Sequence, residues 1–454
     1  MWSDRTPPER LRALVTKLHS VLPAPSNTRT TVRSTASIDQ VEESLHLAPG
    51  FASVTGTKPL LLHNPLATIT YSNGSAVITG PAGPVEVSAP AFDVLDAMIE
   101  AWRGPAEAIL AGFLSYDLAT EIEDLGPTPR QDFSFPQFYF GLYDSYLRLE
   151  GERWVYVATD AWRTPPTSRA LQVLERPIHS GPLGSRPDQS SFEASVKRIV
   201  ATIRAGDIFQ TNLCRRLEAD LDPAMAWDLY QRMRTISPAQ YESYIQIDEQ
   251  RAILSISPEL FLKVDAGMVE SSPIKGTRPR AHDAAEDQTL STELLTSEKD
   301  RAELAMIVDV VRNDLGRVCE TGSVEVAQHA ALMTLPTVHH LYSTVKGRLR
   351  DGLVDLLRAA FPAGSITGAP KIEAIRAAMR EEGQLRGPCM GAIGWISMDG
   401  NMELSVAIRT AFTSDGQVRY YAGCGITADS DPHTEFIESS HKAAAFVRAL
   451  EEVK

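Results

Sequence analysis

The chain has 454 residues, of which 43% are hydrophobic and 22% charged, which is the composition of a globular protein. This length fits roughly two to three ordinary domains or one large interleaved domain. The formal net charge of −14 argues against a nucleic-acid partner and against an anionic membrane surface. An anionic ligand would therefore have to be bound by local cations.

The cysteine pattern and the N-terminus bear on the cellular compartment. Four cysteines are scattered without CxxC spacing, which argues against a zinc site or a disulfide framework and favours a reducing environment. The first residues contain no apolar signal segment, and no run of about 18 apolar residues occurs. We therefore expect a cytoplasmic protein with no membrane span.

The first 176 residues are expected to form an N-terminal β-rich region. Apolar residues recur at helical spacing over residues 11–18 and 92–99. Short β-rich runs lie between them, and the turn signals Asn73-Gly74 and Gly80-Pro81 are typical of hairpins. A further strand is expected at residues 154–158. The Pro-, Gly- and Ser-rich segment 177–191 predicts a linker and the main boundary of the chain, which leaves residues 192–454 as a second domain.

The second half alternates predicted helices and strands. A helix should follow the linker, because Ser190 and Glu193 have capping-box spacing. Asp431-Pro432 is a favourable N-cap and first residue for the closing helix. Between these helices we expect a strand at 209–217, two further strands that lead to Glu259 and to Lys275, and one long helix at 288–315. A loop entering a helix should follow at 361–371, and then strands at 391–396, 405–410 and 418–422, the last ending in the glycine turn 423–425.

The segment 272–280 places a single lysine, Lys275, between Pro273 and Gly276. We expect a turn here, after the strand-like run 251–259. Stiff backbone on both sides can aim a reactive amine, but a solvated turn lysine would have the same local sequence. The segment alone does not decide between these interpretations.

Two glycine-rich segments resemble nucleotide-binding motifs without their context. Residues 423–428 match GxGxxA but lack the following helix, strand and acidic residue of a dinucleotide site. Residues 364–371 resemble a phosphate loop, but Pro370 precedes Lys371 and no Ser or Thr follows it. Both segments can still present backbone N–H groups to an anion.

Four carboxylates form the strongest candidate metal site. Asp300 and Glu303 are three residues apart on one predicted helix, and Glu435 and Glu438 are three apart on another, so each pair shares a helix face. Two such faces suit a hard cation such as Mg²⁺, which leaves room for a ligand carboxylate or phosphate. The alternative is a solvated acidic face, which is less persuasive for the closing helix because Lys442 follows Glu438 by one turn. Arg409 and Lys442 are the candidate cations for an anionic ligand. Arg409 lies among small apolar residues at the end of a predicted strand and would need a partner if it were buried.

Five segments occur in an order that resembles the chorismate-utilising enzymes, a family that includes anthranilate, aminodeoxychorismate, isochorismate and salicylate synthases. The segments are 273–280, 300–317, 368–371, 407–410 and 422–431. The strong match covers residues about 190–450, and residues 112–117 and 138–144 extend it weakly toward the N-terminus. The resemblance implies an α+β fold in which two large, mostly antiparallel β-sheets pack face to face, with helices outside and both halves of the chain contributing.

The resemblance also implies the roles of site residues. Mg²⁺ would be bound directly by Glu303 and Glu438 and through water by Asp300 and Glu435, and it would bridge them to the ring carboxylate of chorismate. Arg409 would bind the enolpyruvyl carboxylate. The remaining residues that would line the site are Gly276, Thr277, His340, Ser365, Gly423, Gly425 and Lys442.

Two positions indicate a branch of the family. Lys275 resembles the aminodeoxychorismate enzymes, whereas anthranilate and isochorismate synthases usually have alanine there. A neutral amine, with its pKa well below about 10.4, could attack C2 of the ring while Glu259, expected on the neighbouring strand, protonates the departing C4 hydroxyl. Gln210 stands where water-adding relatives have a lysine base, and an amide cannot accept a proton at neutral pH.

The expected product is 4-amino-4-deoxychorismate, the precursor of p-aminobenzoate and folate. No glutaminase nucleophile signature occurs in the chain, so the resemblance implies a separate glutamine amidotransferase subunit that supplies ammonia in a heterodimer. Cys389 replaces a tyrosine that often contacts the substrate, and residues 41–44 are at most a remnant of a tryptophan-binding motif. The alternatives are an anthranilate synthase component and a catalytically silent chorismate-binding subunit.

Overall fold

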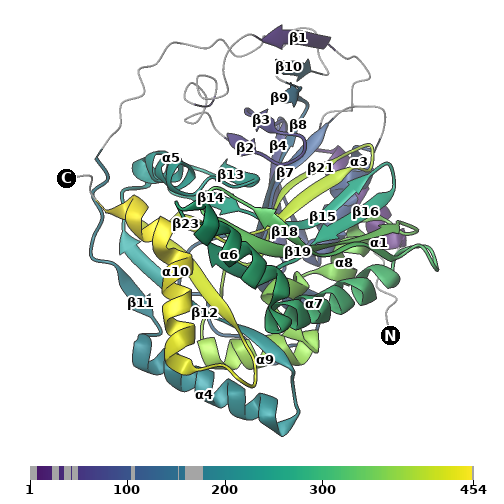
Figure 1. Cartoon of the computed structure of the whole chain (residues 1–454). Helices are drawn as coiled ribbons and strands as arrows, with labels where there is room; N and C mark the ends of the chain where they lie inside the picture. The colour runs from purple at the N-terminus through teal and green to yellow at the C-terminus, as the bar shows by residue number, and fades with distance from the viewer. Residues whose placement is uncertain are drawn as a thin grey trace.

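The computed structural model describes residues 8–22, 30–34, 42, 50–103, 108–151, 153–158 and 177–451. Within these ranges, two 12-stranded sheets pack face to face and helices cover the outside (Figure 1). The neighbouring strands in both sheets pair in antiparallel fashion. The expected α+β architecture is therefore confirmed.

The first sheet combines strands from both ends of the chain. Strand β20 (Gly368–Ala369) pairs with β12 outside the main order. From edge to edge the main order is β1 (Thr30–Ser34), β10 (Arg153–Ala158), β9 (Ser145–Glu150), β3 (Leu60–Leu62), β2 (Ala52–Val54), β13 (Tyr241–Gln246), β14 (Ala252–Ser257), β23 (Thr410–Ser414), β24 (Gln417–Ile426), β12 (Gln210–Asp220) and β11 (Gly184–Arg186).

The second sheet also combines strands from both halves of the chain. Strand β18 (Glu325–Thr334) pairs with β19 outside the main order. The main order is β17 (Ile274–Pro279), β19 (Val338–Arg348), β16 (Met268–Ser272), β15 (Leu260–Asp265), β22 (Met402–Val406), β21 (Ala392–Ser397), β7 (Ile109–Leu114), β8 (Phe138–Tyr143), β4 (Ala67–Ser72), β5 (Ser75–Gly80) and β6 (Gly83–Ser88).

The helices lie around these sheets. Three short 3₁₀ helices are η1 (Tyr116–Glu121), η2 (Pro223–Met225) and η3 (Gly364–Ile366). In the described part of the chain, no helix is both long and apolar enough to cross a membrane. The α-helices are α1 (Pro8–His19), α3 (Ala91–Ala101), α4 (Gln189–Ala205), α5 (Ala226–Ile236), α6 (Ala284–Thr296), α7 (Glu298–Gly316), α8 (Leu353–Ala360), α9 (Lys371–Glu382) and α10 (Pro432–Leu450).

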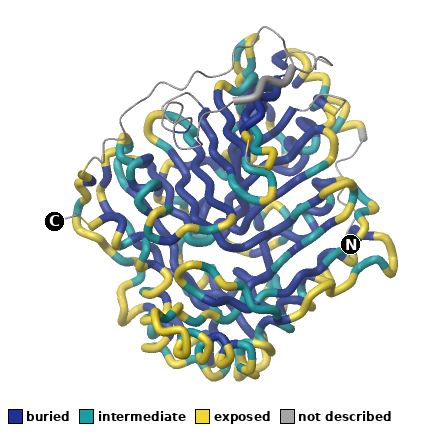
Figure 2. Tube along the Cα trace, turned by 45° about the horizontal axis from the view of Figure 1, so that its top comes forward, coloured by how far each residue is buried: buried dark blue, intermediate teal, exposed yellow. Residues whose placement is uncertain are grey.

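Aromatic side chains fill the space between the sheets. Phe135 lies between Phe113 of β7 and Phe412 of β23, with ring centroids 5.5 and 4.9 Å away respectively. These three rings therefore join the second sheet to the first. Buried residues run through the centre of the molecule, while exposed residues concentrate at its periphery (Figure 2). Burial of this apolar surface is the main force holding the two layers together.

Both sheets interleave the two parts of the chain that the linker at 177–191 was expected to separate. In the first sheet, β2 pairs with β13, and in the second, β7 pairs with β21. Strand β11 lies inside the expected linker and pairs with β12. Strands from before and after residue 177 thus complete each other's hydrogen-bond ladders.

Two helix predictions need correction. The single helix expected at 288–315 is two helices, α6 and α7, because Ser297 has extended backbone and its hydroxyl accepts a hydrogen bond from the Asp300 N–H. This is an N-cap, which starts a new helix. Helix α4 is capped by Asp188, whose carboxylate accepts from the Ser191 N–H, and not by Ser190. The start of α10 after Asp431 is confirmed, since Asp431 accepts from the Thr434 N–H.

A buried ion pair ties α9 to the first sheet. Glu382 accepts two hydrogen bonds from Arg386, at 2.7 and 2.9 Å, and one from the Cys214 N–H at 2.7 Å. Arg386 also donates to the carbonyls of Asn212 and Ile366 and lies 4.2 Å from the Tyr116 ring centre. Both charged side chains are 2% exposed. Removing one partner would leave the other charge buried without its counterion.

We expect Glu382→Ala to lower the free energy of unfolding by about 3–5 kcal/mol, because it leaves Arg386 and the Cys214 N–H without their acceptor. The matched control is Glu373→Ala on the same helix, whose half-exposed carboxylate pairs with Arg376; it should cost less than about 1 kcal/mol. Denaturant unfolding of both variants measures the difference. Equal losses would show that the buried pair has no special role.

Candidate active site

Lys275 lies in strand β17 and not in the expected turn. Its backbone pairs with Leu341 of β19, an interaction that local sequence could not reveal. A register shift follows between Lys275 and Thr277, where Gly276 has a φ of +71°. A Cβ atom at Gly276 would lie 3.0 Å from the Asp300 side chain and 2.9 Å from Leu294. Glycine is therefore required for β17 to approach α6 and α7 this closely.

The amine of Lys275 reaches across to elements of the first sheet. Its Nζ donates to the Ser365 carbonyl at 3.0 Å. A Cβ on Gly425 of β24 would lie 3.5 Å from this Nζ and 2.2 Å from Nε2 of Gln210. Burial lowers the pKa of Lys275 against the raising effect of the Glu303 charge, and the Lys442 charge lowers it further. These surroundings favour the neutral amine.

Glu259 lies in the connection between β14 and β15, where the chain crosses from the first sheet to the second. It was expected on the strand next to Lys275, but the neighbour of β17 is β19. Burial raises the pKa of Glu259 to about 7, although the hydrogen bond from the Ser365 hydroxyl and the Lys275 charge act to lower it. Glu259 and Ser365 line the same small cavity. A carboxyl with a pKa near neutrality can deliver a proton.

Arg409 and His340 form a hydrogen-bonded pair. Arg409 lies between β22 and β23 with a φ of +50°, and so is not a strand residue as expected. Its Nη2 donates to His340 Nε2 at 3.2 Å, so the proton of the neutral imidazole lies on Nδ1, which contacts the Gly276 carbonyl at 3.2 Å and Thr277 Oγ1 at 2.9 Å. Burial and the Arg409 charge lower the pKa of His340 to about 3. Among the described residues no carboxylate forms an ion pair with Arg409.

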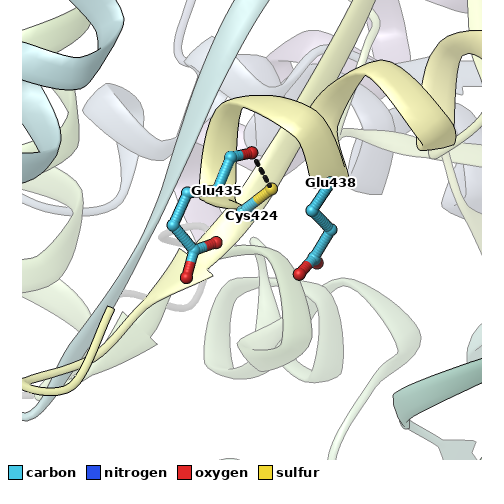
Figure 3. A group of neighbouring side chains, drawn as sticks. All are labelled: Cys424, Glu435 and Glu438. Atoms are coloured by element: carbon cyan, nitrogen blue, oxygen red, sulfur yellow. Dashed lines mark hydrogen bonds between the residues drawn. The ribbon is translucent and has the colours of Figure 1, made fainter. Parts of the chain in front are cut away.

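The expected metal ligands lie on two helices, α7 and α10. The carboxylates of Glu435 and Glu438 point the same way, with the Cys424 thiol beside them donating to the Glu435 carbonyl at 3.2 Å (Figure 3). One ligand atom from each of these three residues lies within 4.8 Å of the others. Glu303 and Asp300 are not part of this group, and Asp300 pairs with Arg278 at 3.3 Å.

The electrostatics of these carboxylates suit a hard divalent cation. Burial raises the pKa of Glu303 and of Glu435, and the charge of Glu438 raises both further. Carboxylate oxygens are the ligands that Mg²⁺ prefers, and a cation would relieve their mutual repulsion. The Cys424 thiol is a soft donor that a magnesium ion does not need. The residues therefore fit a Mg²⁺ ion.

Lys442 binds next to these carboxylates. Its Nζ lies 2.8 Å from Glu438 and donates to the Gly423 carbonyl at 3.0 Å. Gly423 and Gly425 were expected in a turn, but both lie inside β24 and face Cys214 and Asn212 of β12. The ladder with β12 keeps this segment extended, so it does not form the turn of an anion-binding nest. A Cβ on Gly423 would lie 2.5 Å from the Cys214 sulfur, which explains the glycine.

The sequence did not predict several contacts that side chains make at this site. Asp314 and Lys371 form a 2.6 Å ion pair behind Ser365, and Arg386 binds the Ile366 carbonyl. Helical spacing could have placed Asp314 on the α7 face that carries Glu303 and Val311, but nothing local pairs it with Lys371. Gln210 is buried, with its amide oxygen unpartnered among the described residues.

Two further sequence observations concern Cys389 and residues 41–44. The Cys389 thiol is buried and donates to the Thr410 carbonyl at 3.2 Å, so it makes a structural contact. Of residues 41–44, only Glu42 lies within the described residues. Its carboxylate pairs with Arg234 at 2.8 Å.

Comparisons with known proteins agree with this geometry. A family model described as chorismate binding enzyme matches residues 51–448. Aminodeoxychorismate synthase component 1 of Salmonella typhimurium is 34% identical over 86% of this chain and 89% of its own length. Anthranilate synthase component 1 of Streptomyces coelicolor is 43% identical over 58% of this chain and 52% of its own length. The crystal structure of anthranilate synthase component I from Streptococcus pneumoniae is similar with a TM-score of 0.75, at 30% identity over 88% of this chain and 93% of that one.

Glu259 should make stability depend on pH. Its pKa is about 7 in the folded protein and near 4.5 unfolded, so its protonated form stabilises the fold below pH 4.5 and this contribution is lost as the pH rises through 7. From pH 5 to pH 8, the wild type should lose about 2–3 kcal/mol of unfolding free energy relative to Glu259→Gln. Urea unfolding at both pH values measures this difference. Glu249→Gln, an exposed control, should behave like the wild type, and a parallel pH dependence of all three proteins would refute the burial effect.

Proposed function

The chain belongs to the family of chorismate binding enzymes, and on that premise we propose that it aminates chorismate at C4 to give 4-amino-4-deoxychorismate. Its relatives carry two names, aminodeoxychorismate synthase and anthranilate synthase, at comparable identity, so kinship does not select the reaction. The observation that carries the proposal is the amine of Lys275, which is largely buried near Glu259 and Glu303, donates to the Ser365 carbonyl and has a lowered pKa. The proposed site residues all lie within 192–454, which we propose as the catalytic domain.

Chorismate is a dicarboxylate, and the site offers a place for each carboxylate. Arg409 has no carboxylate partner among the described residues and is largely buried, so its charge calls for an anionic ligand. We assign it to the enolpyruvyl carboxylate, with His340 orienting the guanidinium. Ser365, Thr277, Gly276, Gly423, Gly425 and Lys442 would line the remaining surface.

Glu303, Glu438, Glu435 and Asp300 would hold Mg²⁺ close to the ring carboxylate. When bound, this ion neutralises the acidic cluster and anchors the substrate. Without it, the raised pKa values of Glu303 and Glu435 reflect burial and uncompensated repulsion from Glu438.

The first chemical step uses the neutral amine. The Lys275 nitrogen forms a bond to C2 of the ring, the two ring double bonds shift, and the C4–O bond breaks. The proton of Glu259 goes to the leaving hydroxyl, which departs as water. A covalent secondary ammonium at C2 and an ionised Glu259 remain.

In the second step, ammonia forms a bond to C4, the double bonds return, and the C2–N bond to Lys275 breaks. Lys275 leaves as a neutral amine, and the new ammonium at C4 returns one proton to Glu259. The sum is chorismate plus ammonia giving aminodeoxychorismate plus water. The lysine directs the incoming nitrogen to C4, because C2 is occupied while ammonia attacks.

Gln210 disfavours the competing addition of water. Water attacking C2 needs a base, and the resemblance places a lysine base at this position in water-adding relatives. The buried amide of Gln210 cannot accept a proton. Neutral ammonia is a much stronger nucleophile than neutral water and attacks without losing a proton first, so it needs no such base. We infer that a separate glutamine amidotransferase subunit supplies this ammonia.

Product identity tests the proposal directly. Incubation of the pure chain with chorismate, Mg²⁺ and an ammonium salt should give a product with the mass of aminodeoxychorismate. Loss of pyruvate and the fluorescence of anthranilate should be absent, because amination takes place at C4. Anthranilate formation without an added lyase would overturn the assignment in favour of anthranilate synthase, and no turnover at all would favour a silent binding subunit.

Lys275→Ala tests the covalent step. Without the amine, ammonia has no directing group at C2, so C4 amination should fall by at least about 100-fold. Lys346→Ala is the control, since Lys346 lies in the same sheet, 41% exposed and paired with Glu270; its rate should stay within about twofold of wild type. Mass spectrometry of the product over time gives both rates. Unchanged turnover of Lys275→Ala would remove the covalent intermediate from the mechanism.

A further inference from the structure

We propose that Lys371 and Asp314 are a positioning pair that holds the loop 361–370, and with it the carbonyl that receives the Lys275 amine, against helix α7. The inference deepens the proposed function, on which the role of Lys275 rests. Neither residue is one of the groups assigned above to substrate, metal or proton transfer.

The side chain of Lys371 closes the loop. The loop begins after Ala360, the last residue of α8, and ends at Lys371, the first residue of α9. The Lys371 Nζ donates to the Ala360 carbonyl at 2.8 Å, so the residue after the loop binds the residue before it. That carbonyl is at a helix C-terminus, where it lacks a partner within the helix and a lysine binds favourably.

Asp314 fixes the closed loop to α7. Its Oδ2 lies 2.6 Å from the Lys371 Nζ, and the residue is only 5% exposed. Asp314 is two residues from the end of α7, where a carboxylate is opposed by the helix dipole. Burial raises its pKa, and the charge and hydrogen bond of Lys371, followed by the charge of Arg317 at 4.0 Å, lower it. Lys371 is therefore the main counterion of this carboxylate, and α7 is the helix that also carries Glu303.

Other contacts attach the loop to the first sheet. The Asn212 N–H donates to the Thr367 carbonyl at 2.7 Å, and the Phe209 N–H to the Ala369 carbonyl at 2.8 Å. On the α7 side, Gly364 lies so close to the helix that a Cβ there would be 3.0 Å from Val310. The Lys371–Asp314 ion pair adds a polar contact with α7, and the same lysine connects the two ends of the loop. Ser365 lies between these attachments.

Asp314 of this pair also lines a cavity next to the proposed active site. Asp314, Glu259 and Ser365 line one small cavity whose other walls include the apolar Val311, Leu315 and Ala360. Loosening the loop would admit water to this space. Water there would solvate the Lys275 amine, favour its charged form and move the Ser365 carbonyl away from it. A positioning role therefore predicts a change in the amine itself, which a general loss of stability does not.

The test measures Lys275 directly. Each protein is labelled with acetic anhydride over a range of pH, and peptide mass spectrometry gives the pH at which Lys275 labelling reaches half of that protein's own plateau. In Lys371→Met and Asp314→Asn this pH should rise by at least one unit, a tenfold loss of neutral amine at a fixed pH. In amination assays kcat should fall about tenfold, with KM for chorismate within about threefold because Arg409 is untouched. Lys371→Arg should keep the half-labelling pH within about half a unit of wild type and kcat within about threefold of it, because arginine retains the positive charge.

The control is Asp132→Asn, which removes one of the two carboxylates that pair with buried Arg216 of β12, the other being Glu218. It should lose stability and leave the labelling of Lys275 unchanged. Unchanged labelling in folded Lys371→Met and Asp314→Asn would overturn the inference, and so would an equal shift in Asp132→Asn. If Lys371→Met does not fold, Asp314→Asn and Lys371→Arg decide. A labelling shift in a chain whose wild type yields no aminated product would support the pair and refute the proposed function instead.

Discussion

The hydrogen bond from the Lys275 amine to the Ser365 carbonyl joins two parts of the molecule that are distant in sequence, and a third part lies beside it. The amine comes from β17 of the second sheet, and the carbonyl comes from the loop between α8 and α9. Gly425 of β24, in the first sheet, lies close to the same amine. The amine is removed from water only because the two sheets close over it, so the packing of the aromatic core between the layers sets the chemistry of a single nitrogen.

The site contains charges that the protein itself does not balance. Arg409 is largely buried and donates a hydrogen bond to His340, while Glu303 and Glu435 have raised pKa values because burial and the charge of Glu438 oppose their ionisation. Lys442 forms an ion pair with Glu438, and Lys299 lies 4.0 Å from Glu303. An arginine without a carboxylate partner and carboxylates with raised pKa values are complemented by an anionic ligand together with a divalent cation. This is the electrostatic reason for preferring a dicarboxylate substrate bound with Mg²⁺ over a neutral one.

The sequence predicted local features well and long-range partners poorly. Capping chemistry placed the start of α10 at Asp431-Pro432, and Asn73-Gly74 marked a real hairpin between β4 and β5. Lys275 was expected in a turn, because proline and glycine flank it and the pairing with β19 comes from residues more than 60 positions away. The glycines at 423 and 425 indicated a turn for the same reason, although β12 holds them in a strand. Resemblance named most residues of the site, but the pairing of Asp314 with Lys371 depends on how three helices meet, which no local pattern encodes.

The positions of Gln210 and Lys275 suggest how members of one family can catalyse different reactions. Gln210 at the start of β12 and Lys275 in β17 come from different sheets, yet both side chains border Gly425. A lysine at either position, 210 in the first sheet or 275 in the second, would therefore place its amine near Gly425. On the proposed mechanism, an amine at position 210 would act as a base toward water, whereas the amine at position 275 forms a bond to the ring itself. Under this proposal, the sheet that supplies the nitrogen decides whether it accepts a proton or attacks carbon.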